Sequence, residues 1–128
     1  MEDRVPLVPA HVSVAHAARE IAKLDTEVLF ILREGKLAGM VSESDIVRKI
    51  IAAGLDPESI LISDLMQTEV TCIKSGAPLK EACAMIGQEK IRYLPVVNSE
   101  LEPEGLVNAL DLLFFFESSA EFGEILGG

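Results

Sequence analysis

The sequence predicts a mixed α/β (α+β) fold in which the order β-α-β-β-α occurs twice. Two observations support this prediction. Segments in the second half repeat segments in the first half at a nearly constant spacing, as in Gly39 and Gly105, or Asp45 and Asp111. Within each half, a helical hydrophobic pattern is followed by two short apolar runs that are typical of strands. We therefore expect two copies of one small unit.

Each unit begins with a short extended segment, "VPLV" in the first copy and "VTCI" in the second. A helix is then predicted over residues 13–24, because its apolar residues follow an i, i+3, i+4, i+7 stripe. Those residues are Val14, Ala17, Ala18 and Ile21. The stripe recurs 65 residues later, which predicts a helix over residues 78–88 with Pro78 in its first turn. The recurring residues are Leu79, Ala82, Cys83 and Ile86.

Two strands follow each helix. They are predicted over residues 27–32 and 37–41 in the first copy, and over residues 93–97 and 105–107 in the second. The run "VLFIL" lacks polar alternation, so it should be buried on both faces. Aligned on "LPVVN" of the second copy, it puts one inserted residue between helix and strand. This alignment matches Arg92 and Tyr93 with Thr26 and Glu27.

A second helix closes each copy. In the first copy it carries the apolar residues Ile46, Val47, Ile50 and Ile51, and Gly54 should end it. Leu112, Leu113 and Phe116 should have that role in the second copy. The segment "GLDPESILISDLMQTE" joins the copies and contains a turn at Asp56-Pro57.

These elements predict two repeats, residues 5–56 and 60–117, and a C-terminal tail, residues 118–128, in one compact module. One small sheet cannot bury the apolar stripes of its helices alone, so we expect the repeats to pack about a pseudo-twofold axis. Such packing would bring Ser42-x-x-Asp45 and Asn108-x-x-Asp111 into a cleft between the sheets.

The composition excludes several classes of function. The net charge is −10 without a basic cluster, which makes a nucleic-acid partner unlikely and disfavours an anionic membrane surface. The longest apolar stretch, near residues 112–116, is too short to span a bilayer, and the N-terminus lacks the apolar run of a signal peptide. Two cysteines without a C-x-x-C motif favour a reduced, cytoplasmic protein. We predict no metal site and no catalytic set of nucleophile, base and orienting group.

The sequence resembles a tandem pair of cystathionine-β-synthase (CBS) domains, a Bateman module. The resemblance rests on "GKLAGMVSESDIVRKIIAAGLDP", the linker "ISDLM", and then "PLKEACAMI", "IRYLPVV" and "GLVNALDLL". These segments cover nearly the whole chain. The resemblance implies that adenosine-containing ligands bind in the cleft between the repeats. It also implies regulation of a partner protein, usually by a dimer of pairs.

Two interpretations of Ser42-x-x-Asp45 stay open. In the first, Ser42 and Asp45 form a capping box at a helix start, and Asn108 caps the second helix in the same way. In the second, a carboxylate accepts hydrogen bonds from both hydroxyls of a ribose, while N–H groups of the helix start meet a phosphate. In the family, the residues matching Ser42 and Asp45 contact the nucleotide, and Asn108 and Asp111 are their counterparts.

The copies depart from the family pattern in different places. Glu43 stands where a basic residue is frequent, which disfavours a triphosphate there. Asn108 replaces the usual Thr or Ser, although its amide can still donate to a phosphate. Arg92 is a candidate for phosphate contact and Tyr93 for stacking on a purine; the alternatives are a surface charge and a half-buried ring. Met40 and Leu106 should pack in the core or touch the adenine.

Three functions are therefore considered. The first is a regulatory module that binds AMP, ADP, ATP, S-adenosylmethionine or a related adenosyl compound, with no obligatory cofactor, and signals by conformational change. The second is a structural or interaction module with empty ligand sites. The third, an enzyme, ranks lowest. A homodimer is favoured because three consecutive Phe residues, 114–116, cannot all face one side of a helix.

Overall fold

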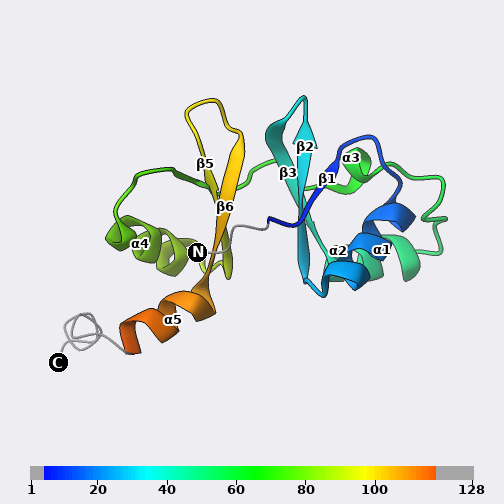
Figure 1. Ribbon diagram of the computed structural model, residues 1–128. Helices are drawn as coiled ribbons and strands as arrows, with labels where there is room; N and C mark the ends of the chain where they lie inside the picture. Colours follow the sequence, from blue (N-terminus) through cyan, green and yellow to red (C-terminus); the bar gives the residue numbers. More distant parts are fainter. Residues whose placement is uncertain (1–4, 118–128) are drawn as a thin grey trace. The chain divides into compact units, whose positions relative to one another are not determined.

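The computed structural model describes residues 5–117. Within them the chain forms two compact units, one spanning residues 6–70 and the other beginning at residue 71. Each unit contains one three-stranded sheet (Figure 1). The predicted order β-α-β-β-α is confirmed in both units. No helix within residues 5–117 is long and apolar enough to cross a membrane.

In the first unit, helix α1 (Val14–Leu24) connects strand β1 (Leu7–Pro9) to strand β2 (Val28–Arg33). Strand β3 (Lys36–Ser42) follows after a tight turn. β1 pairs with β2 in parallel and β2 pairs with β3 antiparallel, so β2 is the central strand. Helix α2 (Glu43–Ile46) continues directly into a π-helical turn, η1 (Val47–Ile51). α1 and α2 lie on the same side of this sheet (Figure 1).

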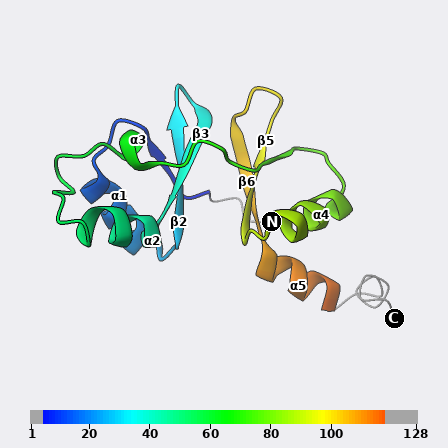
Figure 2. The ribbon, with the colours of Figure 1, turned by 180° about the vertical axis from the view of Figure 1, so that it is seen from behind.

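The second unit repeats this plan. Its elements are strand β4 (Ile73–Lys74), helix α4 (Leu79–Glu89), strands β5 (Tyr93–Val97) and β6 (Pro103–Asn108), and helix α5 (Ala109–Glu117). β5 is the central strand, with β4 parallel and β6 antiparallel to it. Figure 2 shows α4 and α5 from behind. The position of Pro78 was wrong by one residue, because it is the N-cap of α4 and not its first helical residue.

The pairing within each hairpin corrects the alignment of the two copies. Val28 pairs with Ser42, and Tyr93 pairs with Asn108, so Tyr93 is equivalent to Val28 and Arg92 to Glu27. The extra residue therefore lies in the turn between β5 and β6, and not between helix and strand. The sequence misled here because both runs are almost wholly apolar. Sliding one along the other by a single residue costs no visible hydrophobic match.

The core of the first unit lies between its sheet and its helices. Its buried members are Val8, Ala10, Val14, Ala17, Ile21, Leu29, Ile31, Val41, Ile46, Ile50 and Ile62. The α1 stripe is confirmed, since Val14 and Ala17 are fully buried and Ile21 nearly so. Most of "VLFIL" is also buried as expected, although Leu32 is only half-buried.

Only one side of the second helix of the first copy is buried. Ile46 and Ile50 face the core, but Val47 and Ile51 are each 56% exposed. These pairs lie on different sides of the same turns, and only one side meets the sheet and α1. Gly54, with φ +75°, lies in the turn that follows, as expected.

In the second copy, Leu112 packs against the core, whereas Leu113 is exposed. The side chains of residues 114–117 and the tail, residues 118–128, lie outside the described part of the structure. The predictions for Phe116, for the three Phe residues and for the tail therefore stay predictions.

The segment after the first copy packs back onto the first unit. The N–H groups of Val14 and Ala15, in the first turn of α1, donate to the carbonyl groups of Ile60 (2.8 Å) and Pro57 (2.9 Å). A short helix, α3 (Ile62–Leu65), then places Ile62 in the core with no exposed surface. These contacts cover the N-terminal end of α1.

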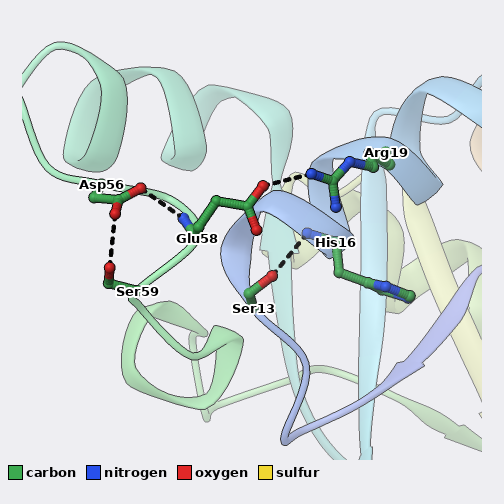
Figure 3. A network of polar contacts seen from close by, with 6 residues as sticks. All are labelled: Ser13, His16, Arg19, Asp56, Glu58 and Ser59. Atoms are coloured by element: carbon green, nitrogen blue, oxygen red, sulfur yellow. Dashed lines mark hydrogen bonds and ion pairs between the residues drawn. The ribbon is translucent and has the colours of Figure 1, made fainter.

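Polar contacts hold the loop before α3 (Figure 3). The Asp56 carboxylate accepts hydrogen bonds from the Glu58 N–H (3.0 Å) and the Ser59 hydroxyl (2.7 Å), and both lower the pKa of Asp56. Arg19 of α1 forms an ion pair with Glu58. Nearby, the His16 N–H donates to the Ser13 hydroxyl, the N-cap of α1. The predicted turn at Asp56 therefore also ties the loop to α1.

Candidate functional site

The first candidate site is the corner where β3 ends and α2 begins. Ser42 has an extended backbone (φ −106°, ψ 158°) and is the N-cap of α2. Its hydroxyl accepts a hydrogen bond from the Asp45 N–H (3.1 Å), and the Asp45 carboxylate accepts one from the Ser42 N–H (3.2 Å). These reciprocal bonds form the capping box that the spacing predicted. They also fix the direction of the Asp45 carboxylate.

Asp45 has two further partners. Its Oδ2 accepts a hydrogen bond from the Gln67 side-chain amide (3.2 Å), and its Oδ1 lies 3.5 Å from the Lys49 ammonium group. Only 14% of the Asp45 side chain is exposed. Burial raises the pKa of Asp45, but hydrogen bonds from Ser42 and Gln67 and the charge of Lys49 outweigh it and lower the pKa overall. The carboxylate is therefore ionised at neutral pH and acts only as an acceptor.

The segment that carries Gln67 lies directly against β3. Met40 and Gln67 exchange two backbone hydrogen bonds of 2.9 and 2.8 Å. Gly39 permits this approach, because a Cβ at that position would lie 2.5 Å from the Met66 sulfur and 2.8 Å from the Gln67 carbonyl oxygen. Gly39 is thus required for its lack of a side chain and not for an unusual backbone angle.

The second corner is built differently. The Asn108 side-chain oxygen accepts a hydrogen bond from the Leu110 N–H (2.9 Å). Asp111 is exposed, and no hydrogen bond or ion pair joins its carboxylate to the described residues. Tyr93 pairs with Asn108 across the hairpin, and the Arg92 guanidinium lies 5.7 Å from the centre of the Tyr93 ring. The structure therefore brings Arg92, Tyr93 and Asn108 together at one end of the sheet.

The two apolar candidates lie in the strands that lead to these corners. Met40 is half-buried, and it faces the same side of β3 as Ser42. Leu106 is 3% exposed and precedes Asn108 in the same way. Neither belongs to the core cluster between sheet and helices, which contains Val41 and Val107 instead. The prediction that these two residues pack in the core therefore holds only in part. Leu106 is buried, but it lies on the face of its sheet opposite to the core cluster.

Sequence reasoning missed two residues that contact Asp45. Lys49 follows Asp45 at the i,i+4 spacing of a helical ion pair, so its contact was readable in the sequence. Gln67 is 22 positions away in a different segment, and its contact depends on the return of the chain along β3. No local pattern indicates such a contact.

The other reactive groups in the described part of the chain are isolated from one another. Burial raises the pKa of the Cys83 thiol, while a hydrogen bond to its own backbone partly opposes this, so little nucleophilic thiolate forms at neutral pH. Cys72 and Cys83 are both free thiols. The His16 ring approaches Glu20 at 3.9 Å on the exposed side of α1. Residues 5–117 contain no cluster of three or more potential metal ligands.

Comparisons with known proteins agree with this architecture. The model of the CBS domain matches residues 1–52 and 62–118. The meiotically up-regulated gene 70 protein of Schizosaccharomyces pombe is 37% identical over 84 residues, which cover 66% of this chain but 11% of that protein. Hypoxic response protein 1 of Mycobacterium tuberculosis is 29% identical over 113 residues, 88% of this chain and 78% of that protein.

A solved structure shares the fold. It is the CBS domain protein PAE2072 from Pyrobaculum aerophilum complexed with AMP, with a TM-score of 0.77 and 23% identity. The similarity covers 89% of this chain and 87% of that one. At 23% identity, the similarity to this structure shows a shared fold and nothing more. Because the family model matches both copies and most of the sequence, the chain belongs to the CBS domain family and carries two CBS domains in tandem.

Proposed function

We propose that this CBS pair is a regulatory module that binds an adenine nucleotide or a related adenosyl compound and signals by conformational change. The observation that carries the proposal is the ionised Asp45 carboxylate, held in place by Ser42 at the end of β3. Two carboxylate oxygens suit the two hydroxyl groups of a ribose. The AMP complex of a structurally similar CBS protein supports the choice of ligand class.

The second corner is the counterpart in this proposal. Asp111 would accept hydrogen bonds from a ribose, and Asn108 would donate its amide to a phosphate. Arg92 is assigned to phosphate contact and Tyr93 to the purine, because both lie beside Asn108. Met40 and Leu106 are assigned to the adenine face, since each lies two residues before its corner. AMP, ADP, ATP and S-adenosylmethionine are all members of the proposed ligand class.

The proposal is tested by titrating the protein with each of these compounds in a calorimeter. Asp45→Asn should weaken binding by roughly 10- to 150-fold, because the charged acceptor contributes about 1.5–3 kcal/mol. Asp64→Asn is the matched control, since Asp64 is an exposed carboxylate on α3. Binding that is equal in wild type and Asp45→Asn would refute the assigned role of Asp45. No binding of any compound would refute the function.

A structural or interaction module is the alternative, and two observations favour it. Ser42 and Gln67 already engage Oδ2 of Asp45, and Lys49 contacts its Oδ1. In addition, Val47 and Ile51 are exposed at i,i+4 positions, and Val47 borders a groove of about 290 Å³ between α1 and α2. Under this alternative the corners only cap helices, and all compounds leave the melting temperature unchanged.

The exposed Val47 and Ile51 also support a homodimer in the proposed function. We assign these two side chains to the contact between copies, where dimerisation would remove them from water. Light scattering should then give twice the 13.8 kDa chain mass. Replacing both residues with Lys should yield a folded monomer, because both are already exposed. A dimer that persists in this variant would place the interface elsewhere.

The proposed module is not an enzyme and works in the cytoplasm, where a regulated protein is its second partner. The free thiols of Cys72 and Cys83 support a reducing setting. Incubation of the purified chain with each nucleotide, followed by chromatography, tests the absence of turnover. Product that forms in proportion to protein concentration would overturn this part of the proposal.

A further inference from the structure

The Asp45 carboxylate has a limited number of acceptor positions. A carboxylate offers about two lone-pair positions on each oxygen. On Oδ2, both are taken, one by the Ser42 N–H at 3.2 Å and one by the Gln67 amide at 3.2 Å. Oδ1 has one contact, the Lys49 ammonium group at 3.5 Å. A ribose that donates one hydroxyl to each oxygen therefore finds Oδ1 accessible and Oδ2 filled.

The three partners of Asp45 differ in how readily they can move. The Ser42 N–H belongs to the backbone of the capping box, so it stays when the helix stays. The Lys49 side chain is 56% exposed and contacts the oxygen that still has capacity. Gln67 is exposed, and its amide reaches Oδ2 at the end of a flexible side chain. Gln67 is thus the partner that a second hydroxyl would replace.

The backbone of Gln67 is held firmly, in contrast to its side chain. Two hydrogen bonds join it to Met40, and Met66 contacts β3 where Gly39 leaves room. The amide therefore returns to Oδ2 whenever the position is vacant, because its starting point does not move. This residue lies in the segment that leads out of the first unit at residue 70.

We propose that Gln67 is a further residue of the ligand site, whose side-chain amide occupies the place of one ribose hydroxyl on Asp45 Oδ2 and is displaced when the ligand binds. The inference rests on the proposed function. Gln67 sets the affinity of the site by competition. Its displacement makes the segment between the two CBS domains respond to whether the ligand is bound.

The test compares the wild type with Gln67→Met, which keeps the length of the side chain and removes its donor. Because the competing hydrogen bond is gone, the affinity for AMP should rise by roughly 2- to 10-fold. Thr68→Ala, a change at the neighbouring exposed residue, should leave the affinity unchanged. In the Asp45→Ala background, Gln67→Met should have no effect, since nothing is left to compete for. Unchanged or weaker AMP binding by the single variant Gln67→Met would overturn the inference.

A second measurement separates this inference from the proposed function. Nuclear magnetic resonance titration without nucleotide should show a higher pKa for Asp45 in Gln67→Met than in the wild type, because one of the hydrogen bonds that lower it is lost. An unchanged pKa would show that the amide does not hold Oδ2, and would overturn the inference whatever binds. If the pKa rises but neither protein binds any adenosyl compound, the proposed function fails and the inference fails with it.

Discussion

The two CBS domains share their order of elements but differ in how much chain covers them. Val14 and Leu79 are equivalent positions at the start of α1 and α4, yet Val14 is fully buried and Leu79 is 38% exposed. The difference comes from residues 57–62, which return over the N-terminal end of α1. In the described structure, α4 has no such cover, and Ala82, at 4% exposure, is its one buried residue. Equal sequence patterns therefore do not produce equal burial.

The same contrast appears at the two candidate corners. Asp45 is mostly buried and engaged by three side chains or backbone groups, while Asp111 is exposed without a partner in the described structure. The returning segment, residues 57–70, again makes the difference, because it supplies Gln67. The corner at Asp45 is preorganised, and neighbouring residues already engage its carboxylate. The corner at Asp111 is open.

The largest effect is expected from the core contact of the returning segment. Ile62→Ala should lower the free energy of unfolding by about 2–5 kcal/mol, since Ile62 is fully buried in the first unit. Leu61→Ala, its exposed neighbour, should change the free energy by less than about 0.5 kcal/mol. Urea denaturation measures both values. Equal losses would mean that the segment adds no specific core contact.

A comparison of two glycines gives the next effect. Gly39→Ala should cost about 1–3 kcal/mol, because the new methyl group would meet Met66 and the Gln67 carbonyl group. Gly87→Ala in α4 meets nothing within 4 Å and should stabilise the protein by up to about 1 kcal/mol. Thermal denaturation shows directly whether each change stabilises or destabilises the protein. Stabilisation by both changes would show that the close approach at Gly39 is absent in solution.

The two aspartates sharpen the comparison through pH. At pH 7, Asp45→Asn should cost about 0.5–2 kcal/mol, because it weakens the cap and removes the ion pair with Lys49. The pKa of Asp45 is lowered in the folded protein, so its contribution is full above the unfolded pKa of about 3.9 and is lost as the pH falls through the folded value. The difference in the free energy of unfolding between Asp45→Asn and the wild type should therefore disappear below about pH 4.

Asp111→Asn is the matched control for this measurement. Because its carboxylate has no partner among the described residues, its replacement should change the free energy of unfolding at pH 7 by less than about 0.5 kcal/mol. Melting temperatures between pH 3 and pH 7 test both variants. A cost at Asp111 as large as that at Asp45 would contradict the difference between the corners.

The smallest effect is expected at the surface of the returning loop. Arg19→Ala should cost about 0.2–1 kcal/mol, since Arg19 and Glu58 are 67% and 59% exposed. The cost should shrink in 1 M salt, which screens exposed charges. Lys23→Ala, on the same helix, should show little dependence on salt. A cost for Arg19→Ala that is unaffected by salt would point to packing of its aliphatic stem instead.

Most of the fold could be predicted because it depends on local patterns. The α1 stripe, the apolar β2 and the turn at Gly54 each have a short-range signature. The alignment of the β2 sequence with the β5 sequence could not be predicted in this way. Its residues are nearly all apolar, so the alignment of the two copies is ambiguous by one residue. That ambiguity determined which first-copy residue matches Arg92.

The residues of the candidate site were likewise predictable only where their contacts are local in sequence. Ser42 and Asp45 were recognisable because a capping box has a fixed spacing of three residues, and Lys49 has a fixed spacing from Asp45. Gln67 was not recognisable, because its contact requires two segments far apart in sequence to lie together. The close approach at Gly39 also escaped detection, since a glycine in a strand has several possible causes.

The path of residues 57–70 also determines how the gene could be divided. A single CBS domain expressed alone must contain residues 6–70, because Ile62 completes its core and the Ile60 and Pro57 carbonyl groups satisfy the start of α1. A fragment that ended at residue 56 would contain every element of the first repeat and still lack part of its interior. A chimera that exchanges one repeat for another should therefore be joined near residue 70, so that the first domain keeps the segment that folds over it.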